Sequence, residues 1–127
     1  NKIKEFNKKY SNSIIFKSMG IQLYHNFVTI SDIVVGNSSS GIIEVPFLNT
    51  PTLNIGDRQK GRYFSSSIFQ CELNSKKIIK SINSILFKKK KIIFEKQFYK
   101  KDTSAKILEK ITELLKHHPN KKVFYNV

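Results

Sequence analysis

Residues 36–41, with the sequence GNSSSG, place three adjacent serine hydroxyls between two glycines. Hydroxyl groups and exposed backbone N–H groups are donors that phosphate oxygens accept from. Glycines let the backbone approach a ligand closely, and a helix beginning at Gly41 would favour negative charge at this turn through its dipole. The pattern therefore predicts a phosphate-binding turn.

Charged residues follow this turn in two places. Glu44 lies four residues after Ser40, within one helical turn, where a carboxylate can accept hydrogen bonds from ribose hydroxyls. Arg58, Lys60 and Arg62 then place three cations within five residues. Guanidinium groups pair well with phosphate oxygens. Turn, carboxylate and cations together predict one half of a nucleotide site.

The elements that must position these residues follow the order strand, turn, helix, strand, loop. The β-branched run at 33–35 predicts a strand buried on both faces of a parallel sheet. Residues 52–55 predict the next strand, and residues 56–62 a loop at its carboxyl end. Open parallel sheets bind ligands at this edge, so the three features fall in the order that a nucleotide crevice requires.

Each feature also has a purely structural explanation. A Ser/Gly turn before a helix is commonly an N-cap, and Glu44 can stabilise a helix N-terminus. The loop cations can be solvent-exposed without binding anything. The placement of all three features at consecutive strand ends favours the binding site.

The strings GNSSSGIIE and PTLNIGDRQKGR resemble the UDP-N-acetylglucosamine 2-epimerase family, most of all its hydrolysing, sialic-acid-pathway branch. The resemblance implies an α/β fold: the Rossmann-like, C-terminal UDP-binding domain of a two-domain glycosyltransferase B type protein. Residues 1–127 are then one domain, and the N-terminal catalytic domain lies outside this chain. The general acid/base carboxylates of the family belong to that other domain.

The resemblance also implies roles for single residues. Ser38 and Ser39 would hold the diphosphate, Glu44 would bind the ribose, and Arg58 would also contact UDP. Met19 resembles the position whose backbone meets the uracil ring. Further UDP-binding or supporting positions of less defined role are Gly41, Lys17, Asn37, Ser40, Gln59 and Arg62.

By resemblance, the full-length enzyme is a homodimer that releases UDP from UDP-N-acetylglucosamine and yields N-acetylmannosamine. The single cysteine, Cys71, excludes an internal disulfide framework and favours a cytoplasmic location. The reaction proceeds by elimination and then addition of water, with no metal or other cofactor. This chain contains no catalytic residue beyond leaving-group stabilisation by Ser38, Ser39 and Arg58, so we expect it to be inactive alone. Close alternatives are a 2-epimerase for UDP-diacetylbacillosamine in the legionaminic acid pathway, a non-hydrolysing epimerase, and a related glycosyltransferase.

The chain departs from the family pattern in two places. Asn49 stands where related sequences usually carry glycine. Asparagine is the next most favourable residue in the left-handed conformation, so we expect the helix to stop there all the same. Residues 63–67, YFSSS, lack the acidic character expected after Arg62, which leaves the substrate open.

The net charge of +14 suggests a different class of function, a basic module that binds nucleic acid or lipid. Residues 1–75 carry eight Lys and Arg against five Asp and Glu, whereas residues 76–101 carry ten lysines against Glu95 alone. The excess charge therefore lies outside the candidate site, and we interpret it as a solvated helix end and loop. With only two arginines and no apolar run of membrane-spanning length, neither nucleic acid nor membrane is the expected partner.

The remaining pattern predicts further elements of the same fold. Strands are expected at 13–17 and 67–71, and helices at 1–10, at 20–31, from 74 to about 90, and from 102 or 103 to 118. Isoleucines 79, 82 and 85 with Leu86 would form the inner face of the third helix. His25 lies off the apolar stripe of the second helix and is interpreted as a surface histidine, and Cys71 as a small buried hydrophobe.

Overall fold

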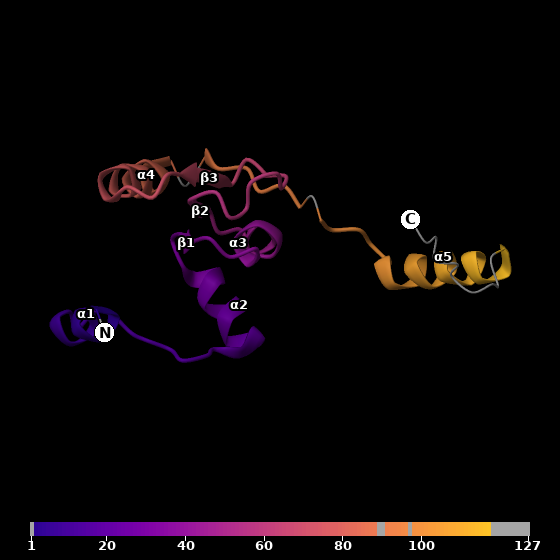
Figure 1. The fold of residues 1–127 in the computed structure, drawn as a ribbon, viewed down its shortest axis with the longest axis horizontal. Helices are drawn as coiled ribbons and strands as arrows, with labels where there is room; N and C mark the ends of the chain where they lie inside the picture. Colours follow the sequence, from indigo (N-terminus) through magenta and orange to yellow (C-terminus); the bar gives the residue numbers. More distant parts are fainter. Residues whose placement is uncertain (1, 89–90, 97, 118–127) are drawn as a thin grey trace, which may run out of the picture. The chain divides into compact units, whose positions relative to one another are not determined.

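The computed structural model describes residues 2–88, 91–96 and 98–117, and it divides the chain into two compact units, Asn1–Gln97 and Phe98–Val127. Figure 1 labels the α-helices and strands of both units. The elements of the first unit are α1 (Lys2–Lys9), α2 (Gly20–Ile30), β1 (Val34–Gly36), α3 (Ser40–Ile43), the 3₁₀ helix η1 (Val45–Leu48), β2 (Thr52–Ile55), β3 (Ile68–Cys71) and α4 (Ser75–Lys88). The second unit contains α5 (Thr103–His117).

The three strands form one parallel sheet in the order β1, β2, β3. Val34 pairs with Thr52, and Thr52 pairs in turn with Ile68. Because the strands are parallel, the segments after Gly36 and Ile55 leave the sheet at the same edge. The predicted α/β class with a Rossmann-like parallel sheet is confirmed, and strand 52–55 has the predicted bounds.

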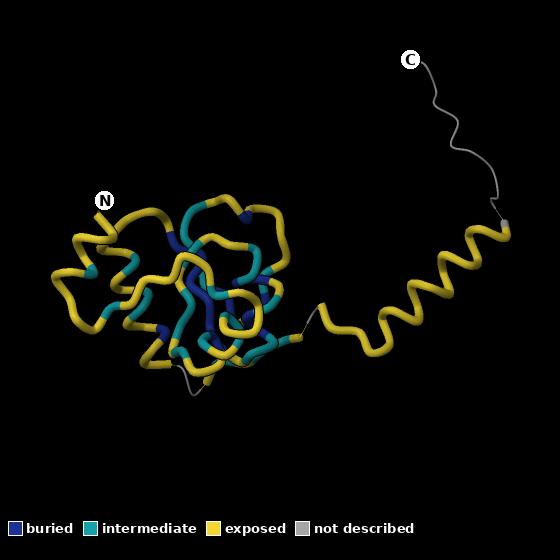
Figure 2. Tube along the Cα trace, turned by 90° about the horizontal axis from the view of Figure 1, so that it is seen from below, coloured by how far each residue is buried: buried dark blue, intermediate teal, exposed yellow. Residues whose placement is uncertain are grey.

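The core lies between β2, β3 and α4. Leu53 is completely buried and packs with Cys71 and with Ile85 of α4. Figure 2 shows the buried positions in the interior of the first unit, and Figure 1 shows α4 beside β3. β2 is buried on both faces although its residues alternate, because the polar side chains of Thr52 and Asn54 are hydrogen-bonded. The burial on both faces predicted for the strand at 33–35 is wrong, since Val35 of β1 is 42% exposed. Cys71 is the small buried hydrophobe that the sequence predicted.

The predicted strand at 13–17 is wrong. These residues form no strand, and Ile14 is 75% exposed. Phe16 packs edge to face against Phe27 of α2, with ring centroids 5.3 Å apart. The apolar run has strand propensity, but a strand also needs a neighbouring strand for its backbone hydrogen bonds. Phe16 packs against a helix instead.

The predicted inner face of α4 needs a correction. Ile78, Ile82 and Ile85 pack toward the core, whereas Ile79 is 60% exposed and Leu86 is 41% exposed. Ile78 and Ile79 are adjacent, and each has a spacing to Ile82 that fits an apolar helix face. The sequence therefore did not determine which of the two faces the core.

The ends of the last two helices agree with the sequence where the structure describes them. The Asn74 side chain caps α4 as predicted, because its Oδ1 accepts the Lys77 N–H at 3.1 Å. In α5 the Asp102 carbonyl accepts the Lys106 N–H at 3.0 Å. The predicted end of α4 near residue 90 and the predicted helix stop at residues 118–119 lie outside the described residues.

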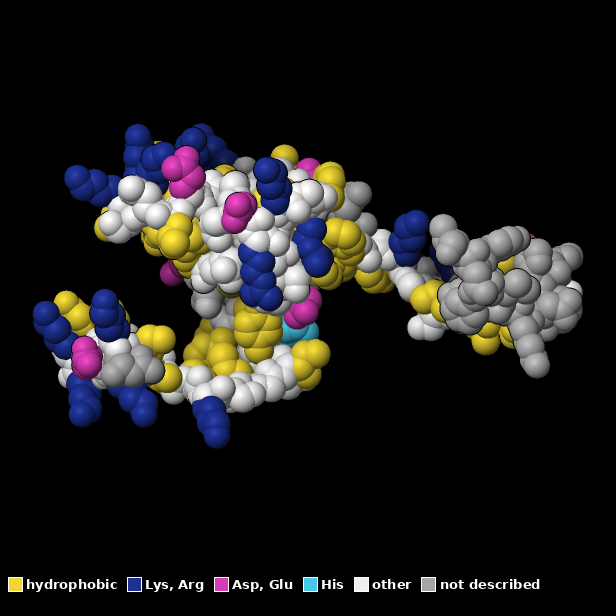
Figure 3. Space-filling view, viewed as in Figure 1, with side chains coloured by type: hydrophobic (Ala, Val, Ile, Leu, Met, Phe, Trp, Pro, Cys, Tyr) yellow, Lys and Arg dark blue, Asp and Glu magenta, His cyan; other side chains and the backbone are white. Residues whose placement is uncertain are grey.

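Lysine and arginine side chains gather over α1 and α4 in Figure 3. Further lysine and arginine side chains lie over the middle of the first unit in the same view. Within the described residues, no helix has both the length and the apolar character needed to cross a membrane.

Asn49 ends η1 in the left-handed conformation, with φ 55° and ψ 35°, as the sequence predicted. We expect Asn49→Val to lower the free energy of unfolding by about 1–2 kcal/mol, because a β-branched residue adopts this conformation poorly. Asn49→Gly should change it by less than about 1 kcal/mol, since glycine also gains entropy in the unfolded chain. Urea denaturation measures both, and a valine variant as stable as the parent would contradict the prediction.

Candidate functional site

The serine turn joins the carboxyl end of β1 to α3. The Ser38 Oγ accepts the Ser40 N–H at 3.3 Å. This hydroxyl therefore stabilises the turn itself, as the purely structural explanation of the serines expects. Ser39 stands at the N-cap, yet its side chain makes no capping hydrogen bond. Within the described part of the chain, no hydrogen bond uses the backbone N–H of Ser38 or Ser39. The turn therefore keeps backbone and hydroxyl donors available for an anion.

The helix after this turn is short. Ser40–Ile43 comprises four residues, and η1 follows after Glu44. A single turn aligns few peptide dipoles, so the dipole contribution that the sequence suggested is small here. Any stabilisation of negative charge depends instead on the donors of the turn and on nearby cations.

Gly41 brings α3 into direct contact with β2. The Thr52 hydroxyl donates to the Gly41 carbonyl oxygen at 2.7 Å, and both residues are buried. A Cβ atom added at Gly41 would lie 2.8 Å from the Thr52 Cγ2 atom, which is too close for two carbons. The glycine thus has a packing role beneath the turn.

The basic loop is tied to the serine turn through Gln59. This side chain is 4% exposed, and its Nε2 donates to the Asn37 carbonyl oxygen at 2.9 Å. Asn37 itself is exposed at the start of the turn. Arg58 is exposed beside Gln59 and makes no ion pair within the described residues. The structure thus brings the turn and the loop together, as the predicted site requires.

Glu44 lies at the other side of the turn and is held by side chains. The His25 Nε2 is 3.0 Å from the Glu44 Oε2, and the Ser40 hydroxyl donates to the same oxygen at 3.4 Å. The Tyr24 hydroxyl lies 2.7 Å from the Ser40 Oγ. The interpretation of His25 as a surface histidine needs correction, because it is half-buried and bonded to a predicted site residue.

Sequence reasoning missed Tyr24 as well as His25. Their partners lie 16 and 19 residues further along the chain, so no local pattern connects them. A cavity of about 220 Å³ lies between Tyr24, the end of β1 and the turn. Its lining includes Ser38 and Gly41.

Three predicted residues lie apart from these contacts. Met19 is half-buried at the N-cap of α2, and Lys17 is exposed two residues earlier. No hydrogen bond or ion pair within the described residues joins either of them to the turn or the loop. Arg62 lines a separate cavity of about 440 Å³ at the end of the basic loop, together with Phe64 and Gln70 among others.

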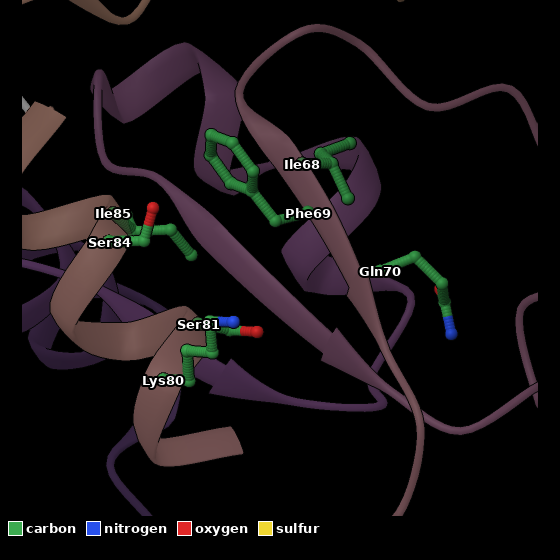
Figure 4. A pocket seen from close by; sticks show the side chains of 7 residues that line it. All are labelled: Ile68, Phe69, Gln70, Lys80, Ser81, Ser84 and Ile85. Carbon is green, nitrogen blue, oxygen red and sulfur yellow. The ribbon is translucent and has the colours of Figure 1, made fainter. Parts of the chain in front are cut away.

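Figure 4 shows another cavity, of about 430 Å³, between β3 and α4. None of its lining residues belongs to the predicted site, and Lys80 is its only charged lining residue. Apolar side chains of Ile68, Phe69 and Ile85 form much of the wall. This cavity therefore offers an anion far fewer donors than the turn and the basic loop.

The loop after Arg62 has an acidic partner from a distant part of the chain. The Tyr63 hydroxyl donates to the Glu95 Oε2 at 3.0 Å, and the Ser66 hydroxyl lies 3.2 Å from the Glu95 Oε1. The hydrogen bond to Glu95, and then its negative charge, raise the pKa of Tyr63 above the usual 10.0. An acidic side chain thus contacts this loop although residues 63–67 contain none.

Comparisons with known proteins agree with the resemblance. The family described as UDP-N-acetylglucosamine 2-epimerase matches residues 1–112. The chain is 48% identical over 60 residues to the GDP/UDP-N,N'-diacetylbacillosamine 2-epimerase (hydrolyzing) of Campylobacter jejuni, a match that covers 47% of this chain and 16% of the relative.

Two further relatives extend this similarity. The polysialic acid biosynthesis protein P7 of Escherichia coli is 40% identical over 82 residues, which are 65% of this chain and 21% of the relative. The UDP-N-acetylglucosamine 2-epimerase of Neisseria meningitidis is 32% identical over 69 residues, 54% of this chain and 18% of that protein. The matches thus span about a fifth or less of the length of these relatives.

Proposed function

This chain belongs to the UDP-N-acetylglucosamine 2-epimerase family, and from that premise we propose that it is the UDP-binding half of a hydrolysing UDP-sugar 2-epimerase. The hydrolysing outcome is supported by the names of two relatives. One is the Campylobacter protein, and the other is the UDP-N,N'-diacetylbacillosamine 2-epimerase (hydrolyzing) of Legionella pneumophila, 37% identical over 60 residues. The N-terminal domain would supply the remaining half of the active site.

One observation supports the UDP site above all others. The Gln59 Nε2 donates to the Asn37 carbonyl oxygen at 2.9 Å, which holds the basic loop against the serine turn. The backbone N–H groups of Ser38 and Ser39, which donate to no group in the described part of the chain, and the guanidinium of Arg58 then lie at neighbouring strand ends. A diphosphate has enough oxygens and negative charge to accept hydrogen bonds from the serine turn and from Arg58 at the same time.

The same groups have a role in the chemistry. When the bond from the sugar to UDP breaks, negative charge develops on the departing diphosphate. Donors fixed at the serine turn, with Arg58, stabilise that charge as it forms and so lower the barrier as well as binding the ground state. Apart from Glu44 and Asp57 the site region carries no carboxylates, so acid/base catalysis belongs to the N-terminal domain, and the chain alone is inactive.

We propose UDP-N-acetylglucosamine as the substrate, with UDP-diacetylbacillosamine as the second candidate. The second candidate is favoured by the 48% identity to the Campylobacter protein. Incubating the full-length enzyme with each nucleotide sugar, and following UDP release and the freed 2-epimer by NMR, separates the two. Faster turnover of the diacetylated sugar would reject the first candidate.

Isothermal titration of the chain with UDP tests the binding site, with UMP and ATP as controls at two salt concentrations. We expect UDP to bind more tightly than UMP, because UMP lacks the second phosphate for Arg58. We also expect ATP to bind weakly, since a purine is larger than uracil. Absence of UDP binding in a folded sample would refute the site, and equal binding of all three ligands with steep salt dependence would indicate a basic module instead.

A further inference from the structure

Four side chains from two segments form a continuous hydrogen-bonded chain beside the serine turn. Tyr24 and His25 belong to α2, Ser40 is the first residue of α3, and Glu44 directly follows the end of α3. The contacts run from Tyr24 to Ser40 at 2.7 Å, from Ser40 to Glu44 at 3.4 Å, and from His25 to Glu44 at 3.0 Å.

The direction of these bonds follows from the carboxylate, which only accepts. The Ser40 O–H and the His25 Nε2–H therefore both donate to the Glu44 Oε2. Since Ser40 has a single hydroxyl proton, the Tyr24 O–H must donate to the Ser40 Oγ. Each of these three hydrogen bonds is therefore donated in the direction of Glu44.

Both donors reach the same oxygen of Glu44. Within the described residues, no hydrogen bond reaches the other oxygen, Oε1. The Glu44 side chain is 44% exposed, so it lies at the surface of the unit. Two donors on one oxygen fix the carboxylate plane and leave the second oxygen as an oriented acceptor.

A second contact also holds α2. The Thr50 hydroxyl donates to the Val28 carbonyl oxygen at 2.7 Å, and Val28 is 3% exposed. This buried contact ties α2 to the segment before β2, so the helix has an attachment besides the bond from His25.

We propose that His25 and Tyr24 are positioning residues that hold Glu44 as the acceptor for ribose hydroxyls. The inference rests on the proposed UDP site and extends it to two residues outside the matching motif. It assigns the site to ribonucleotides rather than 2′-deoxyribonucleotides, because an oriented carboxylate oxygen without a hydroxyl donor loses its partner.

Isothermal titration with UDP and with 2′-deoxy-UDP tests the proposal. We expect the chain to prefer UDP, and His25→Ala to reduce that preference by about threefold to tenfold, the effect of one hydrogen bond. His25→Gln should retain most of the preference, because the glutamine amide can donate from a similar place. Asn26→Ala, at an exposed position of the same helix, is the matched control and should change nothing.

Circular dichroism confirms that each variant is folded, and Tyr24→Phe provides a second variant with minimal change in volume. We expect Tyr24→Phe also to lower the preference for UDP, since it removes the first donor. Equal weakening of both ligands by His25→Ala would overturn the positioning role while leaving the UDP site intact. If the parent chain binds neither ligand, the proposed function fails and this inference fails with it.

Discussion

Arg58→Ala is expected to weaken UDP binding by about 1–3 kcal/mol, roughly 5-fold to 150-fold in the dissociation constant. Arg58 is exposed and has no ion pair within the described residues, so its guanidinium is free to form charge-assisted bonds with the diphosphate. Removing the guanidinium leaves the two phosphate groups of UDP with fewer hydrogen-bond donors. Isothermal titration at fixed salt measures the loss.

The matched control is Lys88→Ala at the end of α4, the helix that begins after the carboxyl end of β3 and runs away from that edge of the sheet. Lys88 is also exposed and positively charged, but it belongs to the lysine-rich segment 76–101. We expect the control to leave UDP affinity within about twofold, the usual range for a distant surface charge screened by salt. If both variants weaken UDP binding equally, the interaction is a general attraction to positive charge, and the specific site at Arg58 is rejected.

Ser39→Ala probes the turn without changing the charge. The Ser39 side chain makes no capping bond in the structure, so its removal should cost little folding stability. We expect UDP affinity to fall by about 1 kcal/mol, the net value of a hydrogen bond. A variant that loses stability but keeps its UDP affinity would instead support the structural explanation of the turn.

Gly41→Ala is expected to lower the free energy of unfolding by about 1–3 kcal/mol, the usual cost of overpacking. The new Cβ would lie 2.8 Å from the Thr52 Cγ2. Thr52 is 2% exposed and its hydroxyl is bonded to the Gly41 carbonyl oxygen, so it cannot turn away without losing that bond. Urea denaturation followed by circular dichroism measures the change.

Gly36→Ala is the control for this prediction. A Cβ at Gly36 meets no atom within 4 Å, and its backbone is not in the positive-φ region. We expect this variant to be as stable as the parent, or slightly more stable, because alanine restricts the unfolded chain. Equal destabilisation by both substitutions would mean that the contact with Thr52 is not the cause.

The same contact predicts an effect on the site. To relieve the overlap, α3 must move away from β2, and the serine turn moves with it. UDP binding should therefore weaken in Gly41→Ala even at temperatures where the variant is folded. The sequence suggested a small residue for the approach of a ligand, and the structure adds that the helix needs the same small residue to pack on the sheet.

Local features of the fold followed from the sequence alone. Residues 52–55 read as the strand that follows the turn and short helix, and the structure gives the same bounds. Asn49 read as a left-handed stop because few other residues tolerate that conformation. In these cases the physical cause acts within a few residues, so the pattern is visible in the chain itself.

Tertiary structure decided what the sequence left open. Residues 13–17 have the composition of a strand, yet pairing depends on a neighbour that only the fold can supply. Ile78 and Ile79 fit the same helical stripe, and only packing against Leu53 chose between them.

The site divides in the same way. The order of turn, carboxylate and basic loop along the chain was readable, because parallel strands bring successive carboxyl ends to one edge. The bond between His25 and Glu44, and the one between Tyr63 and Glu95, join residues 19 and 32 positions apart. No periodicity or motif encodes such contacts, since they arise only when separate elements pack, and that is why His25 looked like an ordinary surface residue until the fold placed it.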